Sequence, residues 1–342
     1  MKRISLITLT MLLCLAITTQ AQQPKGKYAF LRTTNSARVA ALGGLPLPLS
    51  DGDIQLSAFN PSSINEDMNN SLSLSYVDYY TDINYLSAQY SHTFDNIGSF
   101  VGTVQYHNFG TFQETSESGI EMGDFTCAHY SINIGWGRRL SERWTIGAAM
   151  KFAALQDEAY HSGALAVDVA TSYHSSNDWL FTLAARNIGA QLYNNIDNDN
   201  GSLPWSLDLA ASRRLEHLPL TFIFWYDDIQ KWNKLYDDPL DLEGNYDPMT
   251  GQMITDGKVE HFAKNLVCHL GIGGELNLGK NLVLRAAYNY GQRHNMTVPQ
   301  NRTLVGFSVG FGVKIKKFQI DYARSRQNIM ASPNYLTLTV KL

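Results

Sequence analysis

Histidine is the side chain best suited to acid–base chemistry near neutral pH, and this chain contains nine histidines. Two of them, His107 and His129, fall on neighbouring predicted strands, where their imidazoles would face each other. Such a pair is half of a typical zinc ligand set, but two polar residues on an inward face are the favoured interpretation. We therefore expect no metal ion and no cofactor.

Sequence motifs for covalent or metal-assisted catalysis are missing. The sequence contains neither the Gly-x-Ser-x-Gly turn of a serine nucleophile nor the His-Glu-x-x-His pair of a zinc protease. Acyl transfer needs a serine, a histidine and an orienting aspartate or asparagine in contact, and no local pattern indicates such a set. We expect that the protein is not an enzyme.

One long segment, residues 227–261, combines acidic and aromatic side chains. Its carboxylates could supply oxygen ligands to calcium, but their spacing does not match the twelve-residue calcium loop, so a solvated loop is the preferred interpretation. These acids are Asp237, Asp238, Asp241, Glu243 and Asp247. The rings of Trp232, Tyr236 and Tyr246 match the composition of recognition surfaces, and we predict that this loop docks a partner.

The first 21 residues have the order of a secretory signal peptide. Lys2 and Arg3 precede an apolar run that ends at Ile17 and is too short to span a bilayer. We predict cleavage after Ala21. Loss of the two positive charges of Lys2 and Arg3 changes the formal net charge from −4 to −6, and this acidic balance argues against nucleic acid as a partner.

From residue 72 onward, apolar and polar side chains alternate with the period of two that is typical of β-strands. In residues 205–212, for example, Trp205, Leu207 and Leu209 share one face. The predicted strands are 72–80, 83–92, 99–108, 124–137, 144–154, 163–173, 179–188, 205–213, 219–228, 264–275, 281–290, 302–313, 317–324 and 335–342. A soluble sandwich and a membrane barrel show the same alternation, so periodicity leaves both folds open.

The lengths of the connections separate these two folds. Every second connection is short: 93–98, 138–143, 174–178, 214–218, 276–280 and 314–316. Apart from the tight turn at 81–82, the others are longer: 109–123, 155–162, 189–204, 229–263, 291–301 and 325–334. Outer-membrane barrels have short periplasmic turns and longer outer loops, whereas a sandwich has no reason to sort its loops in this way.

Residues 72–342 are therefore predicted to form an all-β fold, a transmembrane, antiparallel outer-membrane β-barrel of about fourteen strands. The chain ends on an amphipathic strand, residues 335–342, whose unpaired edge would invite aggregation. We predict that this last strand pairs with the first, residues 72–80, and closes the barrel.

Residues 22–71 resemble neither a membrane strand nor a loop, and we predict that they form a plug or hatch inside the barrel. An unpaired buried charge is costly, so we expect Arg32 or Arg38 to pair with an acid on a polar strand face. The charged residues on these faces are Asp168, Asp208, Glu275, Arg285 and Asp321. The alternative, in which these groups face lumen water, stays open.

A short signature lies within this plug segment. It consists of Phe30-Leu31-Arg32, Ser36-Ala37-Arg38, Ala41-Leu42-Gly43-Gly44 and Asn60-Pro61. The signature resembles that of the PorV/PorQ family, and its PorQ branch most of all. Members of this family are outer-membrane proteins of the type IX secretion system of Bacteroidetes, and they are similar in fold to FadL, a fourteen-strand barrel with an N-terminal hatch.

The resemblance implies an integral outer-membrane protein that docks a PorZ-like surface protein. PorU-like and PorV-like subunits would complete the cargo attachment complex, and outer-membrane lipid would surround the barrel. The alternative function is a FadL-like transporter of hydrophobic small molecules across the outer membrane. Leu45, Leu47 and Leu49 lie around two prolines and could form the apolar pocket that a transporter needs.

Overall fold

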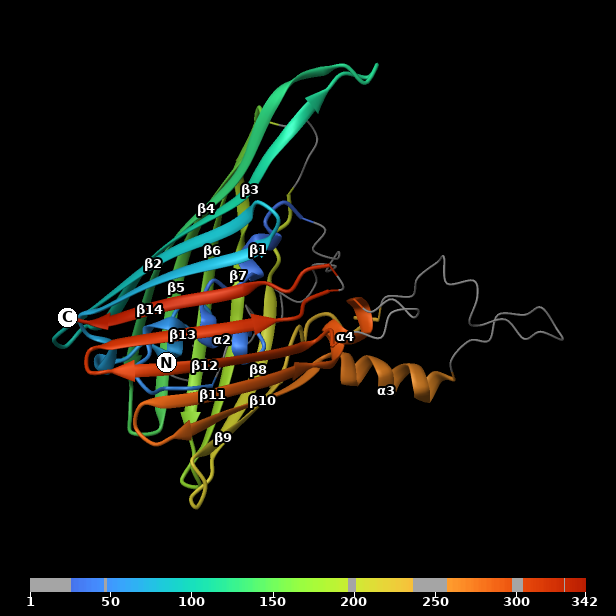
Figure 1. The fold of residues 1–342 in the computed structure, drawn as a ribbon. Coiled ribbons are helices and arrows are strands. Elements are labelled where there is room, and N and C mark those ends of the chain that lie inside the picture. Colours follow the sequence, from blue (N-terminus) through green and yellow to red (C-terminus); the bar gives the residue numbers. More distant parts are fainter. Residues whose placement is uncertain (1–25, 46–47, 196–200, 236–256, 297–303, 329) are drawn as a thin grey trace, which may run out of the picture.

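The structure is a computed structural model that describes residues 26–45, 48–195, 201–235, 257–296, 304–328 and 330–342. In these residues one barrel wall surrounds a short N-terminal segment (Figure 1). The predicted signal peptide and its cleavage site after Ala21 lie outside the described residues.

Fourteen antiparallel strands form the wall. They are β1 (Ser71–Tyr80), β2 (Ile83–Phe94), β3 (Gly98–Thr115), β4 (Glu121–Arg139), β5 (Trp144–Asp157), β6 (Tyr160–His174), β7 (Trp179–Asn194), β8 (Ser206–Arg214), β9 (Leu220–Tyr226), β10 (Leu270–Leu278), β11 (Leu282–Asn289), β12 (Phe307–Ile315), β13 (Phe318–Ser325) and β14 (Asn334–Lys341). Each strand pairs with its sequence neighbours, and β1 pairs with β14. The predicted fourteen-strand antiparallel barrel is therefore confirmed.

The seam between the first and last strands closes the sheet. Leu74 lies opposite Leu338, and Ser75 lies opposite Thr337. The hydroxyl oxygens of Ser75 and Thr337 are 2.9 Å apart on the inner face, which adds a hydrogen bond across the seam. Because β14 has neighbours on both sides, the chain ends on a strand without leaving an open edge.

The two faces of the wall have opposite polarity. On the outer face, large apolar side chains such as Leu74, Ile132 and Val309 are about half exposed. On the inner face, Asp168 and Thr337 are fully buried. A soluble sandwich would bury the apolar face and expose the polar one, so this inversion identifies a barrel whose outer surface suits lipid.

The expected sorting of the connections by length holds only in part. At one end, the turns are 95–97, 140–143, 175–178, 215–219, 279–281 and 316–317. At the other end, the predicted loop 109–123 is wrong, because β3 and β4 continue as a paired hairpin to Thr115 and Glu121. Figure 1 shows this hairpin extending well beyond the other strands. The predicted loop 155–162 is also wrong, because β5 and β6 stay paired to Asp157 and Tyr160 and leave a turn of two residues.

One predicted strand, 264–275, is wrong in its first part. Residues Lys258–Cys268 form helix α3, and β10 begins only at Leu270. Leu270 pairs with Tyr226, the last residue of β9, so the residues before it have no strand to pair with and a helix satisfies their backbone groups instead. Strand β12 likewise begins at Phe307 instead of residue 302, after helix α4 (Tyr290–Met296). Among the described residues, no helix is long and apolar enough to cross a membrane.

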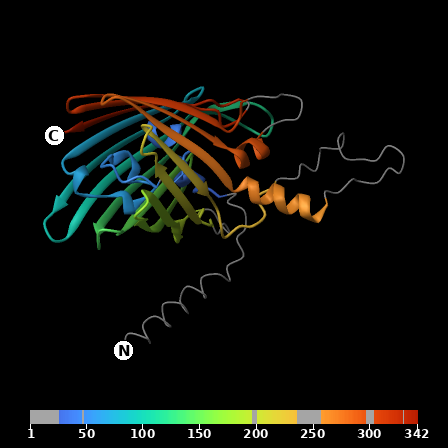
Figure 2. The same cartoon turned by 90° about the horizontal axis from the view of Figure 1, so that it is seen from below.

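The N-terminal segment folds into short helical turns. They are η2 (Ala29–Arg32), α2 (Ala37–Ala41), η3 (Ile54–Leu56), η4 (Pro61–Ser63) and η5 (Glu66–Met68). Figures 1 and 2 show these turns within the ring of strands, and most of their side chains are buried. We call residues 26–45 and 48–70 the plug.

Candidate functional site

The candidate site is the contact between the plug and the inner face of the barrel, and it begins with the capping of α2. The hydroxyl of Ser36 accepts a hydrogen bond from the backbone N–H of Val39 at 3.2 Å and so caps the helix. The helix ends at Ala41, and Gly43 and Gly44 follow with positive φ angles of 99° and 76°, which glycine adopts without strain. This short helix fixes the position of Arg38.

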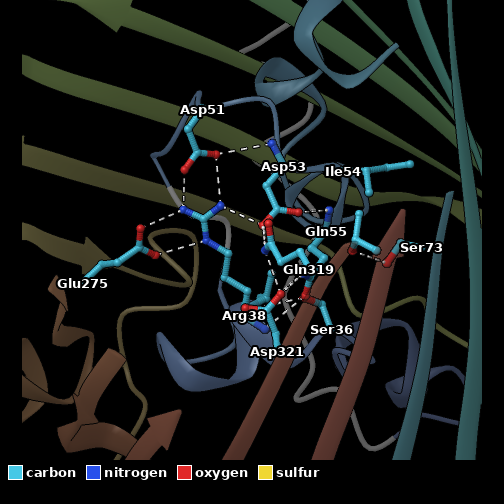
Figure 3. A network of polar contacts seen from close by, with 12 residues as sticks. Ser36, Arg38, Asp51, Asp53, Ile54, Gln55, Ser73, Glu275, Gln319 and Asp321 are labelled. Atoms are coloured by element: carbon cyan, nitrogen blue, oxygen red, sulfur yellow. Dashed lines mark hydrogen bonds and ion pairs between the residues drawn. The ribbon is translucent and has the colours of Figure 1, made fainter. Parts of the chain in front are cut away.

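Arg38 is 3% exposed and forms ion pairs with three carboxylates (Figure 3). Two belong to the plug: Asp51 at 2.5 Å and Asp53 at 2.8 Å. The third is Glu275 on β10, which accepts hydrogen bonds from Nε and Nη2 of Arg38, both at 3.1 Å. The guanidinium group therefore joins the plug to the barrel wall by a forked, charge-assisted contact.

The network continues around the wall through a second arginine. Arg285 on β11 donates to Glu275 at 2.9 Å and to Asp321 on β13 at 2.5 Å. The side-chain amide of Gln55 donates to Asp321 at 2.6 Å and so returns the network to the plug. Three strands and two parts of the plug thus share one continuous polar network.

Negative charge exceeds positive charge in this network. Burial opposes the charge on Arg38, but Asp51, Glu275 and Asp53 outweigh this effect and raise its pKa well above the ordinary value. Burial also opposes ionisation of Asp51, yet Arg38 lowers the pKa of Asp51. For Asp53, burial dominates and raises the pKa, with Asp321 and Asp51 adding to it. The arginine therefore stays charged, and of the two plug carboxyls Asp53 takes up a proton more readily than Asp51.

A second anchor lies at the other end of the barrel. Arg32 donates to Asp228 at 2.8 Å, and Lys234 contacts both Asp227 at 2.5 Å and Asp228 at 3.2 Å. Burial would raise the pKa of Asp228, but the positive charges of Arg32 and Lys234 lower it well below its ordinary value. This cluster attaches η2 to the segment that follows β9.

The third anchor is the Asn60-Pro61 pair. The side chain of Asn60 accepts a hydrogen bond from the backbone N–H of Ser62 and caps η4. The plug backbone approaches β5 closely at Gly147, which has no side chain. A Cβ at this position would lie 2.1 Å from the carbonyl oxygen of Pro61. The hydroxyls of Ser62 and Ser172 on β6 are 2.6 Å apart. The plug backbone therefore rests directly on the wall at this point.

An apolar cluster lies between the anchors. It is formed by Val39, Leu42, Leu45, Leu49, Leu56, Ala58 and Phe59 of the plug and by Ala210, Ile223, Trp225 and Ala287 of the wall. The ring of Trp225 packs against Gly43, where a Cβ would lie 2.6 Å from Cη2. The indole N–H of Trp225 is buried and has no hydrogen-bond partner among the described residues.

A polar cavity of about 240 Å³ lies beside the Arg38 network. Asp51, Glu275 and Arg285 line it together with Lys280, which lies in the turn 279–281, and Lys314, near the end of β12. This cavity and the apolar cluster are thus two chemically different environments within one lumen.

The expected pairing of a plug arginine with a wall acid is confirmed for Arg38 and Glu275. Asp168 and Asp208 instead pair with wall cations, with Lys151 at 2.6 Å and Arg186 at 2.9 Å. The alternative in which these groups face lumen water is therefore wrong for the described residues.

Sequence reasoning missed Asp51, Asp53, Asp228 and Trp225. A usable signal existed for two of them, because Asp51 and Asp53 flank Gly52 in an otherwise apolar stretch. Burial of these acids required a cation, and Arg38 was the nearest candidate in the plug.

The structure places the two histidines as predicted, directly opposite each other on β3 and β4. The ring of Phe30 lies against both, with centroid distances of 5.3 Å to His107 and 5.0 Å to His129. Among the described residues, no cluster of three or more histidine, cysteine or acidic side chains has the arrangement of a metal site.

The predicted docking loop is described only in part. Trp232 is 44% exposed and packs against Phe262 of α3. Tyr236 and Tyr246 lie outside the described residues, as do the acids weighed as calcium ligands and Leu47 of the predicted apolar pocket.

Comparison with solved structures gives the same fold. The toluene transporter TodX of Pseudomonas putida aligns with a TM-score of 0.50 and 14% identity over 90% of this chain and 96% of that chain. A further TodX structure aligns with a TM-score of 0.50 and 12% identity over 91% and 99%. A Pseudomonas aeruginosa FadL homologue gives 0.49 and 10% over 90% and 98%. No protein-family model matches the sequence, and no curated protein matches it significantly.

These identities are low and establish the fold alone. The chain has the fold of an integral, TodX-like outer-membrane β-barrel. The fourteen-strand barrel implied by the sequence resemblance is confirmed, and membership of the PorV/PorQ family stays a prediction.

Proposed function

We propose that the protein admits hydrophobic small molecules across the outer membrane. The observation that carries this proposal is the buried apolar cluster around Trp225, which plug and wall residues form together inside the barrel. Sites for apolar ligands combine hydrophobic walls with few polar groups. In the cluster that holds Leu42 and Leu45, the indole N–H of Trp225 is such a polar group, and it has no partner within the described part of the chain. The fold shared with TodX, described as a toluene transporter, supports this function more than it supports docking.

In this proposal the plug is the gate. Residues Gly43 and Gly44 have the backbone freedom to let the segment that carries Leu45 and Leu49 shift away from Trp225. The ion pairs of Arg38 hold the same segment closed on the side of the polar cavity. A hydrophobic molecule would replace the leucine side chains against the indole ring.

A locked plug tests the proposal. Cysteines replacing Ser62 and Ser172, whose hydroxyls are 2.6 Å apart, would tie the plug to the wall, in a background in which Cys127 and Cys268 are replaced. Uptake of labelled toluene and of a labelled long-chain fatty acid is measured in cells with and without reductant. We expect the oxidised variant to lose uptake and the reductant to restore it; equal uptake in both states would argue against a moving plug.

A variant at the apolar cluster provides the second arm. Trp225→Ala enlarges the cluster without touching the ion pairs, and it should change the ratio of toluene to fatty-acid uptake. For the Ser62/Ser172 cysteine lock, the single variant Ser172→Cys is the matched control, because one cysteine cannot form the plug–wall disulfide. If neither probe enters cells faster than in a strain that lacks the protein, transport of these molecules is ruled out.

A second candidate function is docking, as the PorV/PorQ resemblance implies. It is favoured by the β3–β4 hairpin, which stands beyond the barrel with exposed Phe112, Ile120 and Met122 near its tip. In this candidate the barrel holds a PorZ-like surface protein, with PorU-like and PorV-like subunits in the same complex. No step of this role requires the plug to move.

An affinity pull-down from outer membranes, followed by mass spectrometry, tests docking. Recovery of a PorZ-like protein in near-equal amount, with loss after deletion of residues 112–124, would support it. Recovery of the barrel alone with a bound hydrophobic molecule would support transport instead. The locked Ser62/Ser172 variant should lose transport but still bind the partner, so the behaviour of this one variant separates the two functions.

A further inference from the structure

Helix α3 exposes apolar side chains along one face. Val259, Phe262 and Leu266 are 83%, 53% and 37% exposed. Their spacing of three and four residues places them on one side of the helix. The helix is also anchored beside this face, because Asn265 is fully buried and its side-chain oxygen accepts a hydrogen bond from the backbone N–H of Lys234 at 2.9 Å. The exposed face is therefore held in a fixed orientation.

This apolar face is continuous with the outer surface of the barrel. One turn after Leu266 the chain enters β10, where Leu270 and Ile272 point outward and are about two-fifths exposed. Their partners on β9, Tyr226 and Phe224, lie directly across the ladder. The surface that suits lipid on the wall thus extends onto the helix without a polar break. Both views show α3 leaving the wall at the start of β10 and pointing away from the barrel (Figures 1 and 2).

Aromatic and charged groups border the apolar face. The ring of Trp232 lies 5.0 Å from the ring of Phe262, centroid to centroid. Beside them, Lys264 and Glu260 form an ion pair at 2.9 Å on the helix flank. Tryptophan rings favour the boundary between lipid and water, and an amphipathic helix with such borders suits the interface of a bilayer.

We propose that α3 is an interfacial anchor that lies on the lipid leaflet at the long-loop end of the barrel. Its apolar face would enter about 5–10 Å into the boundary between headgroups and acyl chains. Lipid is the occupant, and not a protein, because the face continues the lipid-facing surface of β9 and β10. The helix would tether the segment between β9 and β10 to the membrane surface, which neither proposed function requires.

Site-directed spin labelling tests the anchor. Cysteines at Val259, Phe262 and Glu260 are labelled one at a time in full-length protein lacking Cys127 and Cys268, reconstituted in phosphatidylethanolamine–phosphatidylglycerol vesicles. Accessibility to oxygen, which concentrates in lipid, is compared with accessibility to a water-soluble nickel chelate. A label at Leu284 on the outer wall reports lipid, and a label at Glu142 in a short turn reports water.

We expect labels at Val259 and Phe262 to resemble the Leu284 label and the label at Glu260 to resemble the Glu142 label. Nickel accessibility at all three helix positions would overturn the proposal. Labels that neither reagent reaches would indicate cover by protein, and this result would also overturn it. As an independent check, Phe262→Asp should restore nickel accessibility at position 259 while the barrel keeps its heat-dependent mobility on gels.

Discussion

At the scale of single residues, Arg38 decides how the plug is held. The buried positive charge of Arg38 is stabilised by the carboxylates of Asp51 and Asp53 in the plug and of Glu275 in the wall. A pair of this kind contributes little net stability compared with an apolar contact of the same shape. The ion pairs instead fix where the plug sits against the wall, because removing one member leaves the other charges buried without a partner.

Arg38→Ala should therefore destabilise the plugged barrel by about 3–5 kcal/mol, because three carboxylates lose their shared cation. The unfolding midpoint in detergent, followed by heat-dependent gel mobility, measures the effect. Arg139→Ala, at an exposed arginine near a short turn, is the matched control. An unchanged midpoint for Arg38→Ala would contradict the role given to this residue.

Acid should weaken the Arg32–Asp228 anchor. The positive charges of Arg32 and Lys234 lower the pKa of Asp228 in the folded state, so its contribution is complete above the unfolded value of about 4 and is lost as the pH falls through the lower folded value. The pKa of its neighbour Asp227 is raised, mainly by burial, so protonation of Asp227 offsets part of this loss.

The test compares Asp228→Asn with the parent protein. The variant should lower the unfolding midpoint most at pH 6, and the difference should shrink as the pH falls to 3 and below. Asp95→Asn, at an exposed turn, should show no such trend. If the difference in unfolding midpoint between Asp228→Asn and the parent grew as the pH fell, the lowered pKa assigned to Asp228 would be wrong.

At the scale of elements, the wall and the plug fit because small residues face the plug backbone. Strands β4 and β5 present Gly137 and Gly147 beneath Pro61 and Ile64. A side chain at either position would collide with plug carbonyl oxygens. The inward-facing positions of the strands are therefore constrained by contact with the plug, just as the outward-facing positions are constrained by contact with lipid.

Gly147→Leu should dislodge η4 while the barrel still closes, since the backbone ladder of β5 does not depend on that side chain. We expect a loss of about 1–3 kcal/mol, typical of overpacking. Limited proteolysis of residues 48–70 in detergent reports the change. Gly102→Leu is the control, because a Cβ at Gly102 has no atom within 4 Å; equal cleavage in both variants would argue against the contact.

At the scale of the whole molecule, closure depends on the pairing of β1 with β14, whose residues are separated by most of the chain. This pairing leaves no free edge and makes the inner and outer faces distinct. The charges on the inner face are matched from two sources: wall cations pair with Asp168 and Asp208, and the plug residue Arg38 pairs with Glu275.

Cysteines at Leu74 and Leu338 should form a disulfide across this seam. The two positions are direct partners, and facing residues of antiparallel strands lie about 4.5–5.5 Å apart, within disulfide range. Oxidation should change the gel mobility of the denatured chain, because a loop of most of its length is closed. Leu74 with Phe311, on strands that are not neighbours, is the control pair and should remain unlinked.

The sequence by itself determined the wall. Alternation, which the lipid and the lumen impose on every strand, predicted all fourteen strands. It failed where local pattern is ambiguous: residues 264–268 alternate like a strand but lie beyond the last partner on β9 and form a helix. The long hairpin of β3 and β4 was missed because its polar outer part lacks a lipid-facing stripe.

Only the tertiary structure decided how the plug is held. The sequence predicted that a plug arginine meets an acid, but which acid depends on register and on the position of α2, as Glu275 shows for Arg38. Asp228 and Trp225 carried no local signal, because their roles arise from contacts between distant parts of the chain. Periodicity reports the environment of a strand, whereas a binding surface depends on which strands and plug turns the closed barrel brings together.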